Sequence, residues 1–280
     1  MDQETVPAAS ATRTRARPCP LCQASGDGAT ALHTQDGWTL ARCGGCGFVF
    51  MPVVPEYTEL TENLAWEVTH PKEALRRKRE YPVLMWLEDA TSWRLSIFPR
   101  TEPVDILNRQ GAAGPVLDVG CGSGGFVRAL AGKFTPYGVE ISARLASEAQ
   151  ALFAPRGGHV VQAPAGDGIA GFPDGFFAGA ILRSYLEHDA DARQVLFALR
   201  PKLRADGIVV IKVPNYGSLN RRMMGTRWCG FRYPDHVNYF TPASLRSLCE
   251  QAGFSVAYPW HLSLPTDDNV VAVLTVKPGR

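Results

Sequence analysis

Residues 116–126, VLDVGCGSGGF, have the residue types and spacing that indicate ligand chemistry most clearly in this chain. An apolar run of buried-strand type ends at Asp118 and turns through several glycines toward a helix-like pattern. Because glycines carry no Cβ, a ligand can approach the backbone N–H groups of such a turn. The carboxylate at the strand end faces the same crevice, so it repels a phosphate and favours a ligand with an ammonium or sulfonium group.

The glycines alone leave more than one ligand class open. Gly120, Gly122 and Gly125 also satisfy the G-x-G-x-x-G fingerprint of dinucleotide-binding domains. Glu140 follows about 20 residues later, where an acid can hold the ribose hydroxyls of a dinucleotide or of an adenosyl ligand. A nicotinamide or flavin domain and a purely structural glycine turn are therefore the alternatives to an adenosyl-binding site.

Two motifs resemble those of class I S-adenosylmethionine-dependent methyltransferases. The segment DVGCGSG at 118–124 resembles their motif I, and YGVEIS at 137–142 resembles their second strand with its ribose-binding acid. The resemblance implies S-adenosylmethionine as the cofactor, with the glycine turn beside its methionine part, Glu140 on the ribose and Ile141 against the adenine. The cofactor-binding residues that it predicts are Asp118, Gly120, Cys121, Gly122, Glu140 and Ile141.

The segment ILRSYLEH at 181–188 extends the resemblance, because it is similar to the fourth-strand segment of the family. The sequence departs from the family pattern at Ala178, where the family often has Asp. His188, at the end of this segment, is a candidate general base, since a neutral imidazole can take a proton near pH 7. The alternative is that Glu187 and His188 only stabilise the loop and the next helix.

The segment 213–242 is too long for a simple connection and is rich in aromatic and polar residues, as binding insertions are. Its PDH and YFTP patterns resemble a large bacterial subgroup of these methyltransferases, many of which accompany polysaccharide or natural-product pathways. His236 is the preferred candidate base, because Trp228, Tyr233 and Tyr239 can enclose an acceptor around it. Four arginines can hold a phosphate or carboxylate or can form a solubilising loop, namely Arg221, Arg222, Arg227 and Arg232.

Four of the seven cysteines fall into two pairs near the N-terminus, with the spacing C-x2-C-x20-C-x2-C. This spacing is typical of a four-thiolate zinc site, and so small a segment needs metal to supplement its limited core. Two redox-active pairs are the alternative. His33 is expected at the surface, because four thiolates complete a tetrahedron. The predicted ligands of this structural zinc are Cys19, Cys22, Cys43 and Cys46.

After residue 113, apolar strand patterns alternate with helical ones, among them a helix expected at 125–132, and this predicts an α/β fold with a doubly wound parallel sheet. Strand-like runs at 254–260 and 269–276 predict an antiparallel edge hairpin. The resemblance then implies the seven-stranded Rossmann-like methyltransferase sheet. We divide the chain into a disordered lead-in at 1–17, a small zinc ribbon at 18–50, a helical linker or lid at 51–112, and the methyltransferase domain at 113–280.

The formal net charge of +2 is close to neutral, so composition indicates neither nucleic acid nor a membrane as the partner. No apolar run reaches the length of a membrane span and no secretory signal is recognised, so a cytoplasmic location is expected. We predict a methyltransferase that acts on a small molecule, which can be anionic, or on a sugar derivative. The alternatives are an RNA methyltransferase that docks through the ribbon and a non-catalytic cofactor-binding partner protein. The acceptor atom and the oligomeric state stay open.

Overall fold

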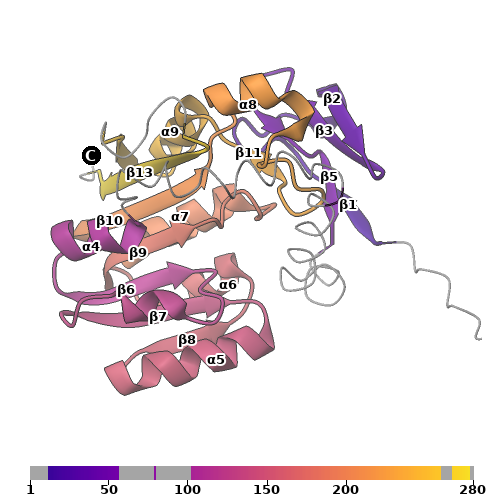
Figure 1. The fold of residues 1–280 in the computed structure, drawn as a ribbon. Coiled ribbons are helices and arrows are strands. Elements are labelled where there is room, and N and C mark those ends of the chain that lie inside the picture. The colour runs from indigo at the N-terminus through magenta and orange to yellow at the C-terminus, as the bar shows by residue number, and fades with distance from the viewer. Residues whose placement is uncertain (1–11, 57–78, 80–101, 260–266, 278–280) are drawn as a thin grey trace, which may run out of the picture.

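A computed structural model of the chain describes residues 12–56, 79, 102–259 and 267–277. Its largest element is a seven-stranded sheet in the order β12-β13-β10-β9-β6-β7-β8 (Figure 1). The strands are β6 (Gly114–Val119), β7 (Phe134–Glu140), β8 (His159–Gln162), β9 (Phe177–Arg183), β10 (Leu203–Pro214), β12 (Phe254–Ala257) and β13 (Asn269–Val276).

The direction of the strands confirms the predicted fold class. Strands β10, β9, β6, β7 and β8 run parallel to one another. Strand β13 runs antiparallel to β10 on one side and to β12 on the other. The C-terminal hairpin therefore inserts its second strand into the sheet and leaves β12 at the edge, which is the α/β arrangement of a Rossmann-like methyltransferase sheet.

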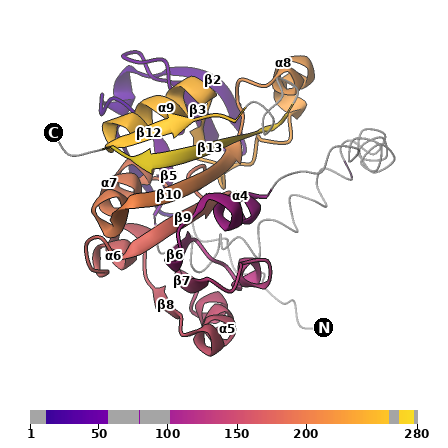
Figure 2. The same cartoon turned by 90° about the vertical axis from the view of Figure 1, so that its left-hand side faces the viewer.

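Helices cover both faces of this sheet (Figures 1 and 2). Val116 and Ile181 face α4, whereas the adjacent Leu117 and Leu182 face the opposite side, because side chains alternate along a strand. The first face carries α4 (Pro103–Gln110) and α5 (Ala143–Phe153), and the second carries α6 (Ala165–Ala170), α7 (Ala192–Lys202) and α9 (Pro242–Gln251).

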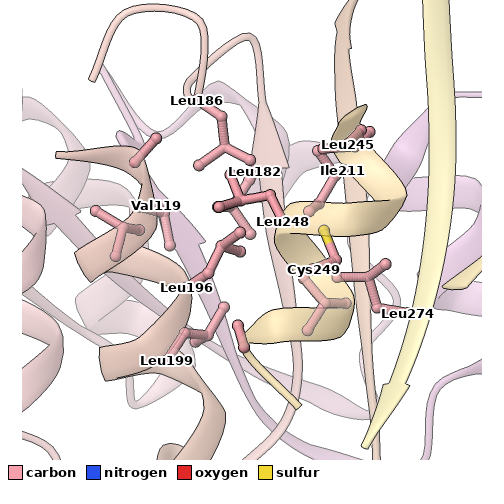
Figure 3. Close-up of a cluster of buried hydrophobic side chains, with 14 of the residues drawn as sticks. Val119, Leu182, Leu186, Leu196, Leu199, Ile211, Leu245, Leu248, Cys249 and Leu274 are labelled. Atoms are coloured by element: carbon pink, nitrogen blue, oxygen red, sulfur yellow. The ribbon is translucent and has the colours of Figure 1, made fainter. Parts of the chain in front are cut away.

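The second face holds the largest apolar core, shown in Figure 3. Helices α7 and α9 meet there over the middle of the sheet, and each fully buried leucine contributes about 1.5–3 kcal/mol through burial. The side chains at this junction include Leu182, Leu196, Leu199, Ile211, Leu245 and Leu248.

The helix predicted at 125–132 is wrong, because the structure has only the single 3-10 turn η2 (Gly125–Arg128). Glycine costs about 1 kcal/mol in a helix interior, and Gly124 is left-handed with a φ of +76°. The guanidinium of Arg156 also holds the chain between η2 and the start of β7 in its observed path. Its N–H groups donate at 2.6–3.1 Å to the C=O groups of Val127, Leu130, Ala131 and Phe134.

A second, smaller unit combines the N-terminal residues with the insertion that follows β10. It consists of a two-stranded sheet, β1-β5, and a four-stranded sheet in the order β11-β4-β3-β2. The edge strand β11 of the four-stranded sheet comes from the insertion, so the ribbon alone does not form the whole sheet. The strands are β1 (Thr14–Ala16), β2 (Thr30–Gln35), β3 (Trp38–Arg42), β4 (Val49–Phe50), β5 (Val53–Pro55) and β11 (Asn238–Tyr239).

The ordered unit is wider than the predicted ribbon boundaries of 18–50. Strand β1 lies inside the lead-in that was expected to be disordered, where it pairs with β5, which lies inside the expected helical linker. The rest of that linker includes α4, and its residues 57–78 and 80–101, with the expected lid, lie outside the described residues. In the part of the chain that the structure describes, no helix is long and apolar enough to cross a membrane.

His33 does not have the surface position expected for it. Its ring stacks on Phe231 and Tyr233 of the insertion, with ring centroids 6.0 and 5.7 Å away. Its Nδ1 also lies 3.2 Å from the Tyr233 hydroxyl. The cysteine spacing could not show this contact, because the two segments lie 200 residues apart.

Arg17 joins the smaller unit to the rest of the protein. The residue is 4% exposed. Its guanidinium donates from Nε to the Met51 carbonyl at 2.9 Å, and from Nη1 and Nη2 to the carbonyls of Ala190 and Val237 at 2.6 Å. These carbonyls belong to the ribbon, to the loop after β9 and to the insertion. Burial lowers the pKa of Arg17 to about 10, so the side chain stays charged at neutral pH.

We expect Arg17→Ala to lower the free energy of unfolding by about 3 kcal/mol, because it removes the guanidinium donor from the Met51 and Ala190 carbonyls and one of the two donors from the Val237 carbonyl. Arg144→Ala is the control, since this arginine is exposed and pairs with Glu148 on the surface, and its effect should stay within about 0.5 kcal/mol. Denaturant titrations of both variants measure the difference. Equal stabilities would contradict the role given to Arg17.

Candidate functional site

Hydrogen bonds to the neighbouring strand hold the glycine turn after β6. The N–H groups of Gly120 and Cys121 both donate to the Val139 carbonyl, at 2.9 and 3.2 Å. Gly120 and Gly122 have φ values of +68° and +54°, in the region that favours glycine. A Cβ on Gly120 would lie 2.3 Å from the ring of Tyr185, whereas one on Gly122 would have no neighbour within 4 Å. The turn therefore leaves open space at Gly122.

Glu140, the predicted ribose-binding acid, ends β7 and is 8% exposed. Its two carboxylate oxygens accept hydrogen bonds from the N–H groups of Gly122 and Ser142, both at 2.9 Å. Each carboxylate oxygen can accept two hydrogen bonds, so the group retains the capacity to accept from a diol. Glu140 thus ties the glycine turn to the start of α5 beside the open space at Gly122.

Asp118 is a second buried acid next to the glycine turn, at 7% exposed. Burial raises the pKa of Asp118 to about 7, and Arg183 and Glu140 then act in opposite directions, downward and upward. A cationic group bound beside Asp118 would favour its ionised form. Its charge state and position therefore suit a ligand with an ammonium or sulfonium group.

The side chain of Cys121, another predicted cofactor-binding residue, lies among apolar side chains. Its Sγ lies where a Cβ on Gly138 would come within 2.7 Å, in the apolar cluster under α5. The Cys121 side chain is therefore part of this apolar cluster. Ile141 is partly buried directly after Glu140. Its contact with adenine and the cofactor roles of the other motif residues stay predictions.

Tyr185 connects the glycine turn to the loop after β9. Its ring lies against Gly120, and its hydroxyl donates to the carboxylate of Asp189. Sequence reasoning missed this residue, because only the folded loop shows that its ring reaches the first glycine of the motif. The loop after β9 therefore contacts the glycine turn through Tyr185.

Other residues of the loop after β9 line a cavity of about 340 Å³, a size typical of small-molecule sites. Its walls come from the loop after β9, the insertion and the start of β13. The lining residues are Ser184, Glu187, His188, Pro214, Trp228, Cys229, Gly230, Arg232, His236, Asp268 and Asn269.

The structure brings together the two candidate bases in this cavity. The rings of His188 and His236 meet edge to face, with centroids 4.6 Å apart. Their Nδ1 atoms face the carbonyls of Asp235 and Gly230 at 3.0 and 2.8 Å. Because a carbonyl can only accept, each Nδ1 carries the proton and each Nε2 carries a lone pair.

Glu187 lies beside both histidines and is 1% exposed. One of its carboxyl oxygens, Oε2, has no hydrogen-bond partner. Burial raises the pKa of Glu187 to about 8, against the effect of Arg232. Burial and Arg232 lower the pKa of His188 to about 4, and burial, His188 and Arg232 lower that of His236 well below its usual value. Both imidazoles are thus neutral at pH 7.

Asp268 holds the insertion in place, which sequence reasoning did not foresee. Its Oδ1 accepts from Nε1 of Trp228 at 2.7 Å and from Ser218 Oγ at 3.1 Å. The Asp268 carbonyl accepts from the N–H of Asn215 at 2.8 Å. In the sequence this aspartate is one of two in a predicted hairpin connection, where acids are common in turns, so no pattern separated it from a turn residue.

The aromatic residues expected around His236 divide between two places. Trp228 lines the cavity. Tyr233 packs against His33 and Phe231 instead, and Tyr239 faces a separate cavity of about 490 Å³ between the ribbon and α9. The predicted enclosure of the acceptor by all three rings is therefore wrong. Tyr239 lies next to the ribbon because its strand, β11, pairs with β4.

The four arginines of the insertion also separate. Arg232 lines the cavity, and its Nε is buried without a hydrogen-bond partner. Arg221 lies over the ring of Tyr216 at 3.9 Å, and Arg222 and Arg227 are exposed. Of these arginines, Arg232 is the one placed to contact a ligand in the cavity with the two histidines.

The four predicted metal ligands come together in the ribbon. Their sulfur atoms lie within 4.8 Å of one another, with Cys19 3.6 Å from Cys46 and Cys22 3.5 Å from Cys43. Thiolates bound to zinc at about 2.3 Å in a tetrahedron lie about 3.8 Å apart. The donor set and its spacing therefore fit a four-thiolate zinc ion.

Two knuckles of the same form position these thiolates. Cys19 accepts at its carbonyl from the N–H of Gln23, and Cys43 does so from Gly47, at 2.8 and 2.9 Å. Gln23 and Gly47 both have a positive φ, of 63° and 74°. Glycine adopts this φ readily in the second knuckle, while Gln23 adopts it in the first as a less common non-glycine residue.

Comparison with known families gives a match over more than half of the chain. A family model for a methyltransferase domain matches residues 95–258. This range includes the glycine turn, Glu140, the loop after β9 and the insertion. No relative of the chain was found among the curated proteins.

Solved structures similar to this one include methyltransferases from bacteria and archaea. A possible histamine N-methyltransferase from Thermotoga maritima is 19% identical, with 69% of this chain and 97% of that chain covered and a TM-score of 0.49. An S-adenosylmethionine-dependent methyltransferase from Archaeoglobus fulgidus is 16% identical, with 72% and 99% covered and a TM-score of 0.47. A putative methyltransferase complex with the Trm112 activator from Haloferax volcanii is 18% identical, with 69% and 97% covered and a TM-score of 0.49.

The buried Asp118 leads to a pH-dependent stability. The carboxyl is ionised in the unfolded chain above about pH 4, whereas its folded pKa is about 7. The folded state therefore binds the extra proton, and stability falls as pH rises between these two values. From pH 5.5 to 8 the wild type should lose about 2 kcal/mol through this group.

Over the same pH range, the free energy of unfolding of Asp118→Asn should fall by about 2 kcal/mol less than that of the wild type, because an amide at this position does not titrate. Asp174→Asn is the control, since the Asp174 side chain is 74% exposed. Denaturant titrations at pH 5.5 and 8 measure the difference. Parallel pH dependence in Asp118→Asn and the wild type would contradict the assignment.

Proposed function

The chain belongs to the methyltransferase-domain family and is an S-adenosylmethionine-dependent methyltransferase, and we propose that its acceptor is a small molecule or sugar derivative bound in the 340 Å³ cavity. The observation that carries this proposal is the cavity itself. It is lined by Ser184 and Glu187 of the same loop whose Tyr185 contacts the glycine turn. Its size suits a compact acceptor.

The position of the ribbon supports a compact acceptor over a nucleic acid. Phe48 of the ribbon packs on Phe240, with ring centroids 5.3 Å apart, and His33 packs on the insertion. The aromatic side chains that ribbons can offer to nucleic-acid bases are here used within the protein. Arg232, with its unpartnered Nε in the cavity, supports an acceptor that carries a carboxylate or phosphate.

The residues of the glycine turn fit the cofactor and divide its binding between them. Asp118 would favour the cationic methionine part, and Glu140 would accept hydrogen bonds from the ribose hydroxyls. When bound, S-adenosylmethionine supplies a methyl group on a sulfonium for direct displacement. The protein must align the acceptor, exclude water and, for a hydroxyl acceptor, remove a proton.

We assign the uptake of that proton to Nε2 of His188 or His236, with His236 preferred. Each Nε2 bears the lone pair because the Nδ1–H of the same ring donates to a backbone carbonyl. Glu187, once ionised, would stabilise the imidazolium that forms. His236 is 5% exposed, so water is largely excluded from its ring.

The ribbon cysteines are proposed to bind one structural zinc. Cys43→Ser should lose one equivalent of zinc relative to the wild type, because three thiolates and a hydroxyl hold zinc more weakly than four thiolates. Cys229→Ser, in the insertion, should keep it. Elemental analysis of the dialysed proteins is the measurement, and an unchanged zinc content in Cys43→Ser would contradict the assignment.

Glu140→Gln should weaken binding of S-adenosylmethionine and of its demethylated product by about 10- to 100-fold, since it removes a charged acceptor for the ribose hydroxyls. Glu148→Gln on the exposed face of α5 is the matched control and should bind as the wild type does. Calorimetry with both cofactor forms and with NAD measures this. Tighter binding of NAD would contradict the cofactor assignment.

His236→Ala should lower turnover by about 10²- to 10⁴-fold with cofactor affinity nearly unchanged, which is the usual range for removal of a general base. His188→Ala tests the second candidate, and His159→Ala on exposed β8 is the control. Single-turnover rates and cofactor titrations separate the two effects. Near-normal rates in both variants would show that neither histidine takes the proton.

Substrate class is tested by transfer of a labelled methyl group into fractionated cell extract. We expect label in the low-molecular-weight fraction, insensitive to ribonuclease and absent with His236→Ala. Label that stays with RNA and is released by ribonuclease would contradict the small-molecule proposal. Glu140→Gln, which should lose transfer into any fraction, identifies label that depends on this active site.

A further inference from the structure

The three side chains Glu187, His188 and His236 form a ligand set. One donor atom of each, a carboxyl oxygen or an imidazole nitrogen, lies within 4.8 Å of the other two. Two imidazoles and one carboxylate are a common set of protein ligands for zinc and related ions in sites that keep an open position. We propose that Glu187, His188 and His236 bind one divalent transition-metal ion in the acceptor cavity.

The orientation of the histidines is the first argument for this site. Metal-bound histidines nearly always donate their other ring N–H to a carbonyl, a carboxylate or water, which fixes the ring and the tautomer. Here the Nδ1 atoms of His188 and His236 face the carbonyls of Asp235 and Gly230 at 3.0 and 2.8 Å. Both Nε2 lone pairs are thereby fixed as free donors to an ion.

The carboxyl of Glu187 is the second, independent argument. Its Oε2 is buried and lacks a hydrogen-bond partner, although the residue is only 1% exposed. A buried polar atom without a partner costs roughly 1–3 kcal/mol, and native proteins contain few of them. An ion shared with the two histidines would give this oxygen a partner that the described protein groups do not supply.

The backbone also holds these three residues from opposite sides of the cavity. The N–H groups of Val237 and Asn238, which follow His236, donate to the Glu187 carbonyl at 2.8 and 3.1 Å. The loop after β9 and the insertion are thus joined at the position of the proposed ligands. Ligand atoms on a tetrahedral ion with bonds of about 2.1 Å lie about 3.4 Å apart, a separation inside the 4.8 Å within which the three donor atoms lie.

Two further charged residues line the same cavity. Arg232 opposes a cation, and Asp268, whose carboxylate is held by Trp228, favours one. Arg232 and the ion would both lie in the wall of this cavity. Their positive charges together would favour an acceptor with an anionic oxygen. This inference rests on the proposed function for the acceptor only. Metal binding itself depends on the three ligands.

The proposal changes how the acceptor would lose its proton. With Nε2 of both histidines on the ion, neither ring would accept that proton, and the ion would instead lower the pKa of a bound hydroxyl so that its proton passes to solvent water. Loss of turnover in His236→Ala is expected in both cases. The two cases are distinguished by metal binding, which can be measured without substrate or cofactor.

The test uses Co²⁺ added to the full-length protein whose four-cysteine site already holds zinc. We expect one further equivalent of Co²⁺ to bind with a Kd of about 10 µM or below, and its X-ray absorption spectrum to show nitrogen and oxygen neighbours and no sulfur. His236→Ala and Glu187→Gln should each weaken this binding about 100-fold or more. His159→Ala on exposed β8 should bind as the wild type does.

The two ligand variants keep the test decisive, because Glu187→Gln preserves the size of the side chain and melting curves show whether either variant is folded. Co²⁺ that binds equally to the wild type and to a folded Glu187→Gln or His236→Ala overturns the proposal. So does the absence of saturable binding to the wild type, or a spectrum with sulfur neighbours. In those cases the general-base assignment and the methyltransferase function stand unaffected.

Discussion

The backbone of Val237 and Asn238 is the joint on which the described structure depends. Its N–H groups donate to the Glu187 carbonyl, and the Val237 carbonyl accepts from Met51 N–H at 3.0 Å and from Arg17 at 2.6 Å. Asn238 then donates from Nδ2 to the carbonyls of Leu186 and Asp189, both at 2.7 Å. A buried guanidinium is stable only when its donors are satisfied. Arg17 therefore fixes the ribbon, the loop after β9 and the insertion in a single arrangement.

This joint gives the N-terminal ribbon a structural role in a methyltransferase whose displacement step needs no zinc. None of the ribbon residues lines the 340 Å³ cavity, yet strand β4 pairs with β11, which follows His236 by two residues. A zinc ion bound by the four thiolates would make the position of β4 rigid. Because β11 pairs with β4, its position would be restrained as well. The ribbon thus supports the 340 Å³ cavity through Val237 and Asn238, whose N–H groups donate to the carbonyl of Glu187 in its lining.

The sequence predicted what local patterns encode. The seven strands follow from apolar runs, and the turn at Gly120 and Gly122 follows from the positive φ values that favour glycine. The cysteine spacing indicated the cluster because both knuckles are local. Sequence could not show contacts between distant segments, such as Arg17 with Val237, Tyr185 with Gly120, or Asp268 with Trp228. The helix expected at 125–132 failed for a related reason, since Arg156, outside that segment, donates to carbonyls between Val127 and Phe134 and holds a path that the local pattern does not encode.

The central claim is that the cofactor on the glycine turn faces the cavity that holds Glu187, His188 and His236. A crystal structure with the demethylated cofactor tests it most directly. The account predicts ribose hydroxyls on the Glu140 carboxylate, the amino group near Asp118, and the sulfur directed past Tyr185 toward the cavity lined by Ser184 and His188. A sulfur that points away from this cavity, or a cofactor bound elsewhere, would contradict the account.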